Sequence, residues 1–206
     1  MALSYSLVGV SELDSLSDQK IVQNLKSQMR DFECLDTRTV KRFITTENVY
    51  IAEDHGESRT YLAINEDDNS MIGFFTLGLT SVKWEKITCS EGWSALSKKK
   101  QAKYSKGVRQ STDGYVGVYT IGELARSSRF THEDFPGTVL LREAISQVMR
   151  AREISGGRFL LVDSLQHLYD ALYSKAGFIR IGDLEAPDED DEAQYCVSIL
   201  TLENLL

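Results

Sequence analysis

The stretch that decides the fold runs from Tyr115 to Phe178 and reads YVGVYTIGELARSSRFTHEDFPGTVLLREAISQVMRAREISGGRFLLVDSLQHLYDALYSKAGF. Residues 115–125 are rich in β-branched and aromatic side chains, which predicts a strand. A polar loop follows at residues 126–136, and a helix is predicted from Gly137. The apolar face of this helix consists of residues spaced by three and four: Leu141, Ala144, Ile145, Val148 and Ala151.

The second half of this stretch predicts another strand and another helix. Gly156-Gly157 ends the first helix, and residues 159–162 form a short apolar run that is typical of a strand covered on both faces. Gly177 ends the second helix, at a position where glycine tolerates left-handed dihedral angles. The apolar stripe of this second helix comprises Leu165, Leu168, Tyr169, Leu172 and Ala176.

A helix that begins at a glycine directly after a loop has a physical use. The amide N–H groups of its first turn have no partner within the helix, and the helix dipole adds partial positive charge. A phosphate group can bind there, and Gly137 has no side chain to block it. A single glycine is also common at helix starts that bind nothing. The neighbouring motifs therefore have to decide whether this one marks a phosphate site.

Three short motifs in this stretch follow the order of a known family. They are Leu124-Ala125-Arg126, Gly137-x-x-Leu140-Leu141 and Tyr173-x-x-x-Gly177-Phe178. Together they resemble the acetyl-CoA-binding core of the GNAT N-acetyltransferase family. Residues 59–64 and 70–77 are similar to the central hairpin of that family. The resemblance implies an α/β (α+β) fold, with a mixed, mostly antiparallel central sheet flanked by helices.

The loop before the helix departs from the family's pattern. The usual pyrophosphate loop reads Arg/Gln-x-x-Gly-x-Gly/Ala, which places His132 at the basic or amide position and Phe135 at the middle glycine. Only Gly137 is retained, in a longer loop that includes Arg129 and Phe130. This departure leaves the tightness of acetyl-CoA binding open.

The resemblance also assigns the contacts to acetyl-CoA, the one cosubstrate expected. Main-chain groups of residues 124–126 would face the pantetheine arm, and the amides of residues 137–139 would meet the pyrophosphate. Arg129 could reach a CoA phosphate. The expected cofactor-binding residues are therefore Leu124, Ala125, Arg126, Arg129, Gly137, Thr138 and Val139.

Two residues are candidates for the chemistry of acetyl transfer to an amine. Tyr173 occupies the position of the family's general acid, where a phenol can protonate the leaving thiolate of CoA. The alternative is a core tyrosine in an amphipathic helix. Glu123 is the candidate base, since a carboxylate in an otherwise apolar strand needs a reason to be there. The face of the strand that Glu123 occupies cannot be derived from the sequence.

The rest of the chain predicts further elements around this core. A strand is expected within residues 4–13, a helix after Ser17-Asp18, and a second helix capped by Asp36 or Thr37. The polar cluster 65–70 between two apolar runs predicts a hairpin. Residues 195–202 predict a final strand, which follows an acidic connection containing Asp183, Glu185, Asp188, Glu189, Asp190, Asp191 and Glu192.

An insertion is expected at about residues 85–113, between the hairpin and the strand that starts at Tyr115. It carries a basic run, and Trp84 and Trp93 are expected to pack it onto the body. The basic run is either a solvated helix face or a flank of the active site. It comprises Lys98, Lys99, Lys100, Lys103, Lys106 and Arg109.

The overall composition is that of an ordinary globular protein. At 206 residues, with 42% hydrophobic and 26% charged residues, the chain fits one globular domain over residues 1–206. No signal peptide or apolar run of membrane-spanning length is found. Three widely spaced cysteines predict reduced thiols and a cytoplasmic location. Histidines and cysteines show no spacing typical of a metal site.

Three functions remain open. The first is acetyl transfer from acetyl-CoA to a primary amine of a small molecule or protein. The second is a catalytically silent member that binds a protein, which the altered loop favours. The third is toxin-like acetylation of aminoacyl-tRNA with an antitoxin partner, because residues 59–63 and 156–159 look most like the compact GNAT subgroup that includes toxins.

The charge distribution argues against a nucleic-acid acceptor. The net charge is −8, and residues 98–109 alone contribute six positive charges and no negative one, so the remainder carries −14. The long-range field of such a chain attracts a cationic amine or basic peptide and repels a polyanion. An amine-bearing small molecule or protein is therefore expected over tRNA.

Overall fold

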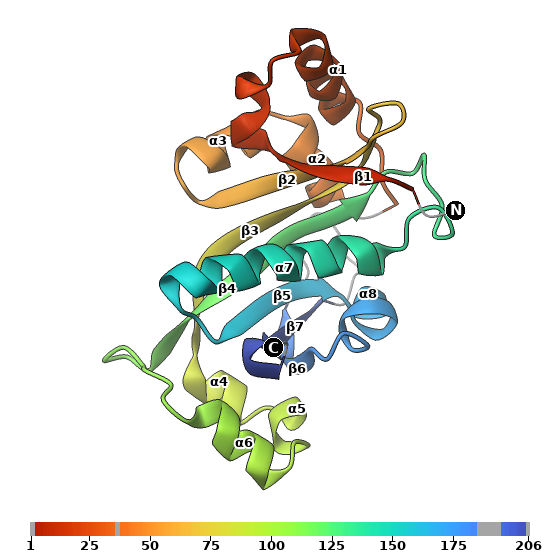
Figure 1. Ribbon diagram of the computed structural model, residues 1–206. Helices are drawn as coiled ribbons and strands as arrows, with labels where there is room; N and C mark the ends of the chain where they lie inside the picture. Colours follow the sequence, from red (N-terminus) through yellow and green to blue (C-terminus); the bar gives the residue numbers. More distant parts are fainter. Residues whose placement is uncertain (1–2, 36–37, 185–194, 205–206) are drawn as a thin grey trace. The chain divides into compact units, whose positions relative to one another are not determined.

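The computed structural model describes residues 3–35, 38–184 and 195–204 (Figure 1). The strands are β1 Tyr5–Gly9, β2 Ser58–Asn65, β3 Met71–Lys83, β4 Tyr115–Arg126, β5 Phe159–Leu165, β6 Ile179–Leu184 and β7 Tyr195–Thr201. The α-helices are α1 Gln19–Arg30, α2 Arg38–Thr45, α3 Asn48–Asp54, α4 Trp84–Thr88, α5 Glu91–Ser94, α6 Lys98–Ser105, α7 Gly137–Ser155 and α8 Gln166–Leu168. Short 3-10 helices lie at η1 Val10–Ser15 and η3 Leu202–Asn204, and η2 Tyr169–Tyr173 is a π-helical turn.

The strands form one hydrogen-bonded sheet in the order β1-β2-β3-β4-β5-β7-β6. β1 pairs antiparallel with β2, β2 with β3, β5 with β7, and β6 with β7. β4 and β5 run parallel, with Tyr119 opposite Leu160 and Ile121 opposite Val162. The predicted mixed, mostly antiparallel sheet flanked by helices is confirmed.

The chain divides into two compact units, each with its own core. The first unit comprises residues 1–78 and 122–146, and the second comprises residues 79–121 and 147–206. Thus β3, β4 and α7 each contribute residues to both units. Organisation as a single domain over residues 1–206 stays a prediction.

The first unit contains the predicted hairpin and N-terminal elements. The carboxylate of Asp18 accepts hydrogen bonds from the amides of Lys20 and Ile21, which confirms the predicted start of α1. Phe74 of β3 is fully buried and meets Phe32 edge-on, with ring centroids 5.3 Å apart. The predicted caps Asp36 and Thr37 lie outside the described residues. The helix α3 was not predicted, because it has a weak apolar pattern over only seven residues.

A close approach of backbone atoms fixes the middle of the first unit. A Cβ atom added at Gly73 of β3 would lie 2.5 Å from the carbonyl oxygen of Ala125 and 2.9 Å from a side-chain methyl of Leu140. Only a residue without a side chain fits at this point. Gly73 therefore lets the end of β4 and the first turns of α7 pack directly against β3.

The second unit contains the predicted insertion. Residues 84–105 contain the three short helices α4, α5 and α6 (Figure 1). Trp84 lies edge-on to Trp93 at 5.4 Å between ring centroids and 5.8 Å from the ring of Phe159 in β5. Packing of the insertion by its two tryptophans is thus confirmed, within a core that also contains Ile87, Tyr104, Val118 and Ile199.

The end of the chain agrees with the prediction in part. The C-terminal strand is β7, and Gly177 has the expected positive φ of 91°. The second helix of the core stretch is shorter than predicted, since α8 spans three residues and continues as the π-turn η2. Most of the acidic connection, residues 185–194, lies outside the described residues.

The close approach at Gly73 generates a stability prediction. Gly73→Ala forces a methyl group against the backbone of Ala125, so we expect a loss of about 1–3 kcal/mol in the free energy of unfolding. Gly117→Ala is the matched control, because nothing lies within 4 Å of its added Cβ. Chemical denaturation of both variants measures the difference, and equal stabilities would contradict the account.

Candidate functional site

The loop between β4 and α7 lies in the first unit and is tied to the sheet by its own backbone. Ser127 is buried, and its amide donates to the carbonyl of Ile72 in β3 at 2.8 Å. The next amide, of Ser128, donates to the carbonyl of Glu33 at 2.8 Å. The loop therefore leaves β4 in a fixed direction.

Side-chain hydrogen bonds also hold the two ends and the tip of this loop. The guanidinium of Arg126 donates to the carbonyl of Phe135 at 2.8 Å, which joins the two ends of the loop. At the tip, the Asp134 carboxylate accepts from both the amide and the hydroxyl of Thr131, each at 2.8 Å. These hydrogen bonds, first the one from the Thr131 amide, lower the pKa of Asp134.

The position of the Phe135 side chain explains how the loop accommodates a bulky residue where the family has a glycine. Its side chain is 2% exposed and meets the ring of Tyr5 edge-on at 5.0 Å. The Tyr5 hydroxyl in turn donates to the carboxylate of Glu143 on α7 at 2.8 Å. Burial, followed by the hydrogen bond to Glu143, raises the pKa of Tyr5. The bulky residue at the middle-glycine position thus points into the core of the first unit.

The start of α7 is at Gly137, as the sequence predicts. The amide of Val139 donates to the carbonyl of Pro136 at 2.9 Å, so Pro136 occupies the cap position. The first-turn amides of Gly137 and Thr138 are available to an anion on general grounds. The expected contact of the Val139 amide with the pyrophosphate stays a prediction. Arg129 and His132 are exposed.

Glu123 lies on β4 in the first unit and is partly buried. Its amide donates to the side-chain hydroxyl of Thr76 on β3 at 2.8 Å. Thr76 is 2% exposed. An added Cβ at Gly122 would lie 2.8 Å from the same hydroxyl oxygen. No sequence pattern singles out Thr76, because its contact with the Glu123 amide depends on how β3 and β4 are aligned.

Tyr173 lies in the second unit at the end of the π-turn η2. Its side chain is 5% exposed and meets Phe178 edge-on at 5.4 Å between centroids. The amide of Ser174 donates back five residues to the carbonyl of Tyr169 at 2.8 Å. Such π-turns often occur at functional sites, because the additional residue redirects a side chain. The core alternative for Tyr173 is compatible with its burial.

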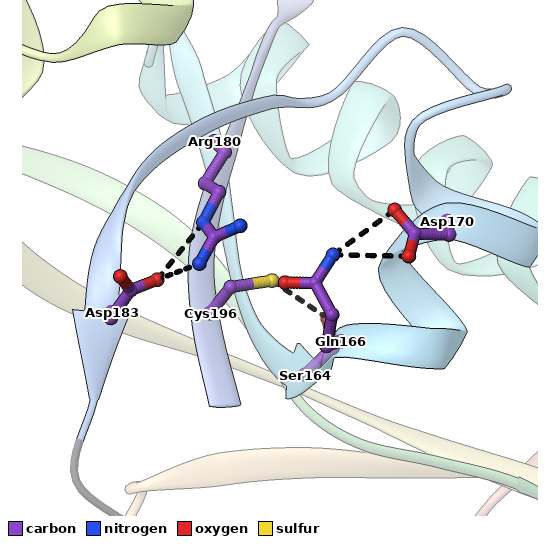
Figure 2. A network of polar contacts seen from close by, with 6 residues as sticks. All are labelled: Ser164, Gln166, Asp170, Arg180, Asp183 and Cys196. Atoms are coloured by element: carbon purple, nitrogen blue, oxygen red, sulfur yellow. Dashed lines mark hydrogen bonds and ion pairs between the residues drawn. The ribbon is translucent and has the colours of Figure 1, made fainter. Parts of the chain in front are cut away.

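Three separate polar pairs lie on the elements that flank Tyr173 in the second unit (Figure 2). The amide group of Gln166 on α8 donates to both carboxylate oxygens of Asp170, at 3.0 and 3.1 Å. At the end of β5, the Ser164 hydroxyl lies 3.9 Å from the sulfur of Cys196, whose pKa is raised by burial. Figure 2 also shows the ion pair of Arg180 with Asp183 on β6.

The described residues show no group of three or more histidine, cysteine, aspartate and glutamate side chains that could hold a metal ion. Within the same residues, no helix is both long and apolar enough to cross a membrane. Cys34, Cys89 and Cys196 form no disulfide bond with one another.

The loop generates a second prediction. Phe135→Ala removes the ring that packs on Tyr5, so we expect a loss of about 3–5 kcal/mol in the free energy of unfolding. His132→Ala is the control from the same loop. Its exposed side chain predicts a change of at most about 0.5 kcal/mol. If thermal or chemical denaturation ranks the two variants the other way, the placement of Phe135 is wrong.

Comparison with known proteins adds structural relatives. No protein-family model matches the chain, and no curated protein matches it in sequence. A crystal structure of a bacterial toxin is similar over 98% of this chain and 93% of that chain, with 12% identity and a TM-score of 0.67.

Two structures of the toxin AtaT are also similar. A tyrosine-to-phenylalanine mutant bound to the C-terminus of the antitoxin AtaR and to acetyl-CoA matches 100% of this chain and 96% of that chain, with 15% identity and a TM-score of 0.59. AtaT complexed with acetyl-methionyl-tRNAfMet matches 98% of this chain and 97% of that chain, with 18% identity and a TM-score of 0.58. At these identities the likeness establishes the fold: the chain has a GNAT-like fold, shared with toxins of known structure.

Proposed function

We propose that this protein is an N-acetyltransferase that transfers the acetyl group of acetyl-CoA to a primary amine. The observation that carries the proposal is the fixed loop that ends at Gly137, directly before the 19-residue helix α7. The bulky Phe135 of this loop is buried against the ring of Tyr5. The structure of an AtaT mutant with bound acetyl-CoA supports the proposal from a protein of the same fold.

Acetyl-CoA would be held mainly by main-chain groups. The amides of Gly137 and Thr138 would bind the pyrophosphate, where the helix dipole favours negative charge. Leu124, Ala125 and Arg126 would present the backbone of β4 to the pantetheine arm. Arg129 is exposed and can supply a positive charge to a CoA phosphate.

Acetyl-CoA supplies an activated acyl group, so the protein has to orient the amine and manage protons. Tyr173 is proposed as the general acid that protonates the thiolate as the C–S bond breaks. The Tyr173 side chain is buried, and the low local dielectric strengthens any hydrogen bond that its phenol donates. Glu123 is proposed as the group that accepts a proton from the amine, directly or through water.

The α-amine of an aminoacyl-tRNA is a second candidate acceptor. The structure of AtaT with acetyl-methionyl-tRNA favours it, and so does α6, where Lys98, Lys99 and Lys100 are exposed in one turn. The net charge of −8 argues the other way. Incubation with acetyl-CoA and, in parallel, charged tRNA or small amines decides between them by the dominant acetylated product. In either case the reaction is expected in the cytoplasm.

Binding of acetyl-CoA at the start of α7 can be tested without turnover. A ligand at one hundred times its dissociation constant stabilises the folded state by about 2.7 kcal/mol, which raises the melting temperature. Gly137→Gln places a side chain where the pyrophosphate would lie, so this stabilisation should be lost. Gly117→Gln, which points into open space, should retain it. An unchanged thermal shift in the Gly137 variant refutes the placement.

The role of Tyr173 can be separated from its packing. Tyr173→Phe keeps the ring against Phe178 but removes the proton donor, so turnover should fall on the order of a hundredfold with an unchanged affinity for acetyl-CoA. Tyr169→Phe is the control, because it removes a hydroxyl that donates to the carbonyl of Phe178 at 3.3 Å and for which no chemical role is proposed. Steady-state kinetics that show normal turnover for Tyr173→Phe would make Tyr173 a core residue.

A further inference from the structure

A cavity of about 270 Å³ lies within the second unit. Three apolar side chains from three strands form part of its lining, and hydroxyl groups and two charged side chains complete it. The lining residues are Thr80, Ser81, Val82, Lys86, Thr120, Leu161, Asp163 and Val197. The cavity therefore combines one carboxylate and one ammonium group with an apolar surface.

The carboxylate of Asp163 has no partner in the described part of the chain, where it makes neither a hydrogen bond nor an ion pair within 4 Å. Asp163 lies on β5 opposite Val197 of β7, directly after Val162, where the described pairing with β4 ends. Asp163 is an exposed residue. The surrounding protein still desolvates the carboxylate enough to raise its pKa, although the positive charge of Lys86 opposes this effect.

Lys86 reaches the cavity from α4. Gly182 of β6 makes room for its stem, because an added Cβ at that position would lie 3.0 Å from Cε of Lys86. Lys86 and Asp163 line the same cavity without forming an ion pair between them. Each charge is thus available to a ligand.

A surface carboxylate is usually just solvated, but Asp163 differs in its surroundings. It lines the cavity together with Val82, Leu161 and Val197, whose apolar side chains offer its carboxylate no hydrogen bond. Unpaired and partly desolvated titratable groups in a concave site are typical of binding sites. An ammonium ligand would supply the missing partner, and its alkyl part would cover the apolar side chains.

We propose that this cavity binds the acceptor amine, with Asp163 holding the primary ammonium group and Lys86 excluding a second positive charge. The cavity then selects an amine on a short apolar body over a diamine or polyamine. Its role as the acceptor site rests on the proposed acetyltransferase function, whereas its selectivity for ammonium ligands can be measured without acetyl-CoA.

Matched probes test the charge pattern. The probes are n-pentylamine, n-pentanol and putrescine, the diamine in which a second ammonium group replaces the terminal methyl group of n-pentylamine. The full chain should bind n-pentylamine on the order of tenfold more tightly than n-pentanol, because a charge-assisted hydrogen bond is lost in the alcohol. It should also bind n-pentylamine more tightly than putrescine, since Lys86 repels the second charge.

Substitutions test the separate roles of Asp163 and Lys86 in ligand binding. Asp163→Asn should bind n-pentylamine on the order of tenfold more weakly and no longer prefer it to n-pentanol. Lys86→Met should bind putrescine as tightly as n-pentylamine. Asp113→Asn is the control, because it removes the same charge from an exposed loop position and should bind like the parent. Calorimetry or NMR titration measures these affinities, and thermal unfolding checks that each variant is folded.

The outcomes separate this inference from the proposed function. If Asp163→Asn binds n-pentylamine as tightly as the parent, the inference is overturned, even if the protein acetylates amines. If the ammonium preference depends on Asp163 but the protein does not bind acetyl-CoA, the cavity is established and the enzyme function fails. If both are correct, Asp163→Asn raises KM for the amine with little change in the dissociation constant of acetyl-CoA.

Discussion

The close approach of backbone atoms at Gly73 is the constraint on which the first unit depends. Because no side chain fits between β3 and the carbonyl of Ala125, the end of β4, the loop after it and Leu140 of α7 are held in one arrangement. The amide of Ser127, bound to the Ile72 carbonyl, continues this attachment by one residue. The direction in which the loop presents Gly137 follows from these contacts, and the proposed cofactor site depends on that direction.

The parts of the fold with strong local patterns were predictable from the sequence. The strand at residues 159–162, the helix that starts at Gly137 and the hairpin around residues 65–70 all have patterns that local physics decides, and the structure contains them. The features that were missed depend on long-range contacts. Thr76 becomes relevant only through the register of β3 with β4, and Asp163 only because α4 and β7 meet beside it. The π-turn before Tyr173 likewise has no signature in its spacing.

The candidate cofactor site shows how a motif can be lost while its physical basis is retained. The sequence has Phe135 where the family has a glycine, which favoured a catalytically silent protein. In the structure this ring packs on Tyr5 inside the first unit, and the Arg126 guanidinium closes the loop behind it. An anion needs a helix start with amides that have no partner within the helix, and Gly137 and Thr138 are proposed to provide them. A bulky residue at the middle-glycine position therefore does not by itself exclude phosphate binding at this loop.

Calorimetric titration of the unmodified chain with acetyl-CoA tests whether the protein binds and uses this thioester. We expect saturable binding of one acetyl-CoA per chain, with an affinity that falls when Gly137 is replaced, and release of CoA once an amine acceptor is added. If no heat of binding and no thermal stabilisation are found at saturating acetyl-CoA, the chain retains the fold without the activity, and the proposed function is wrong.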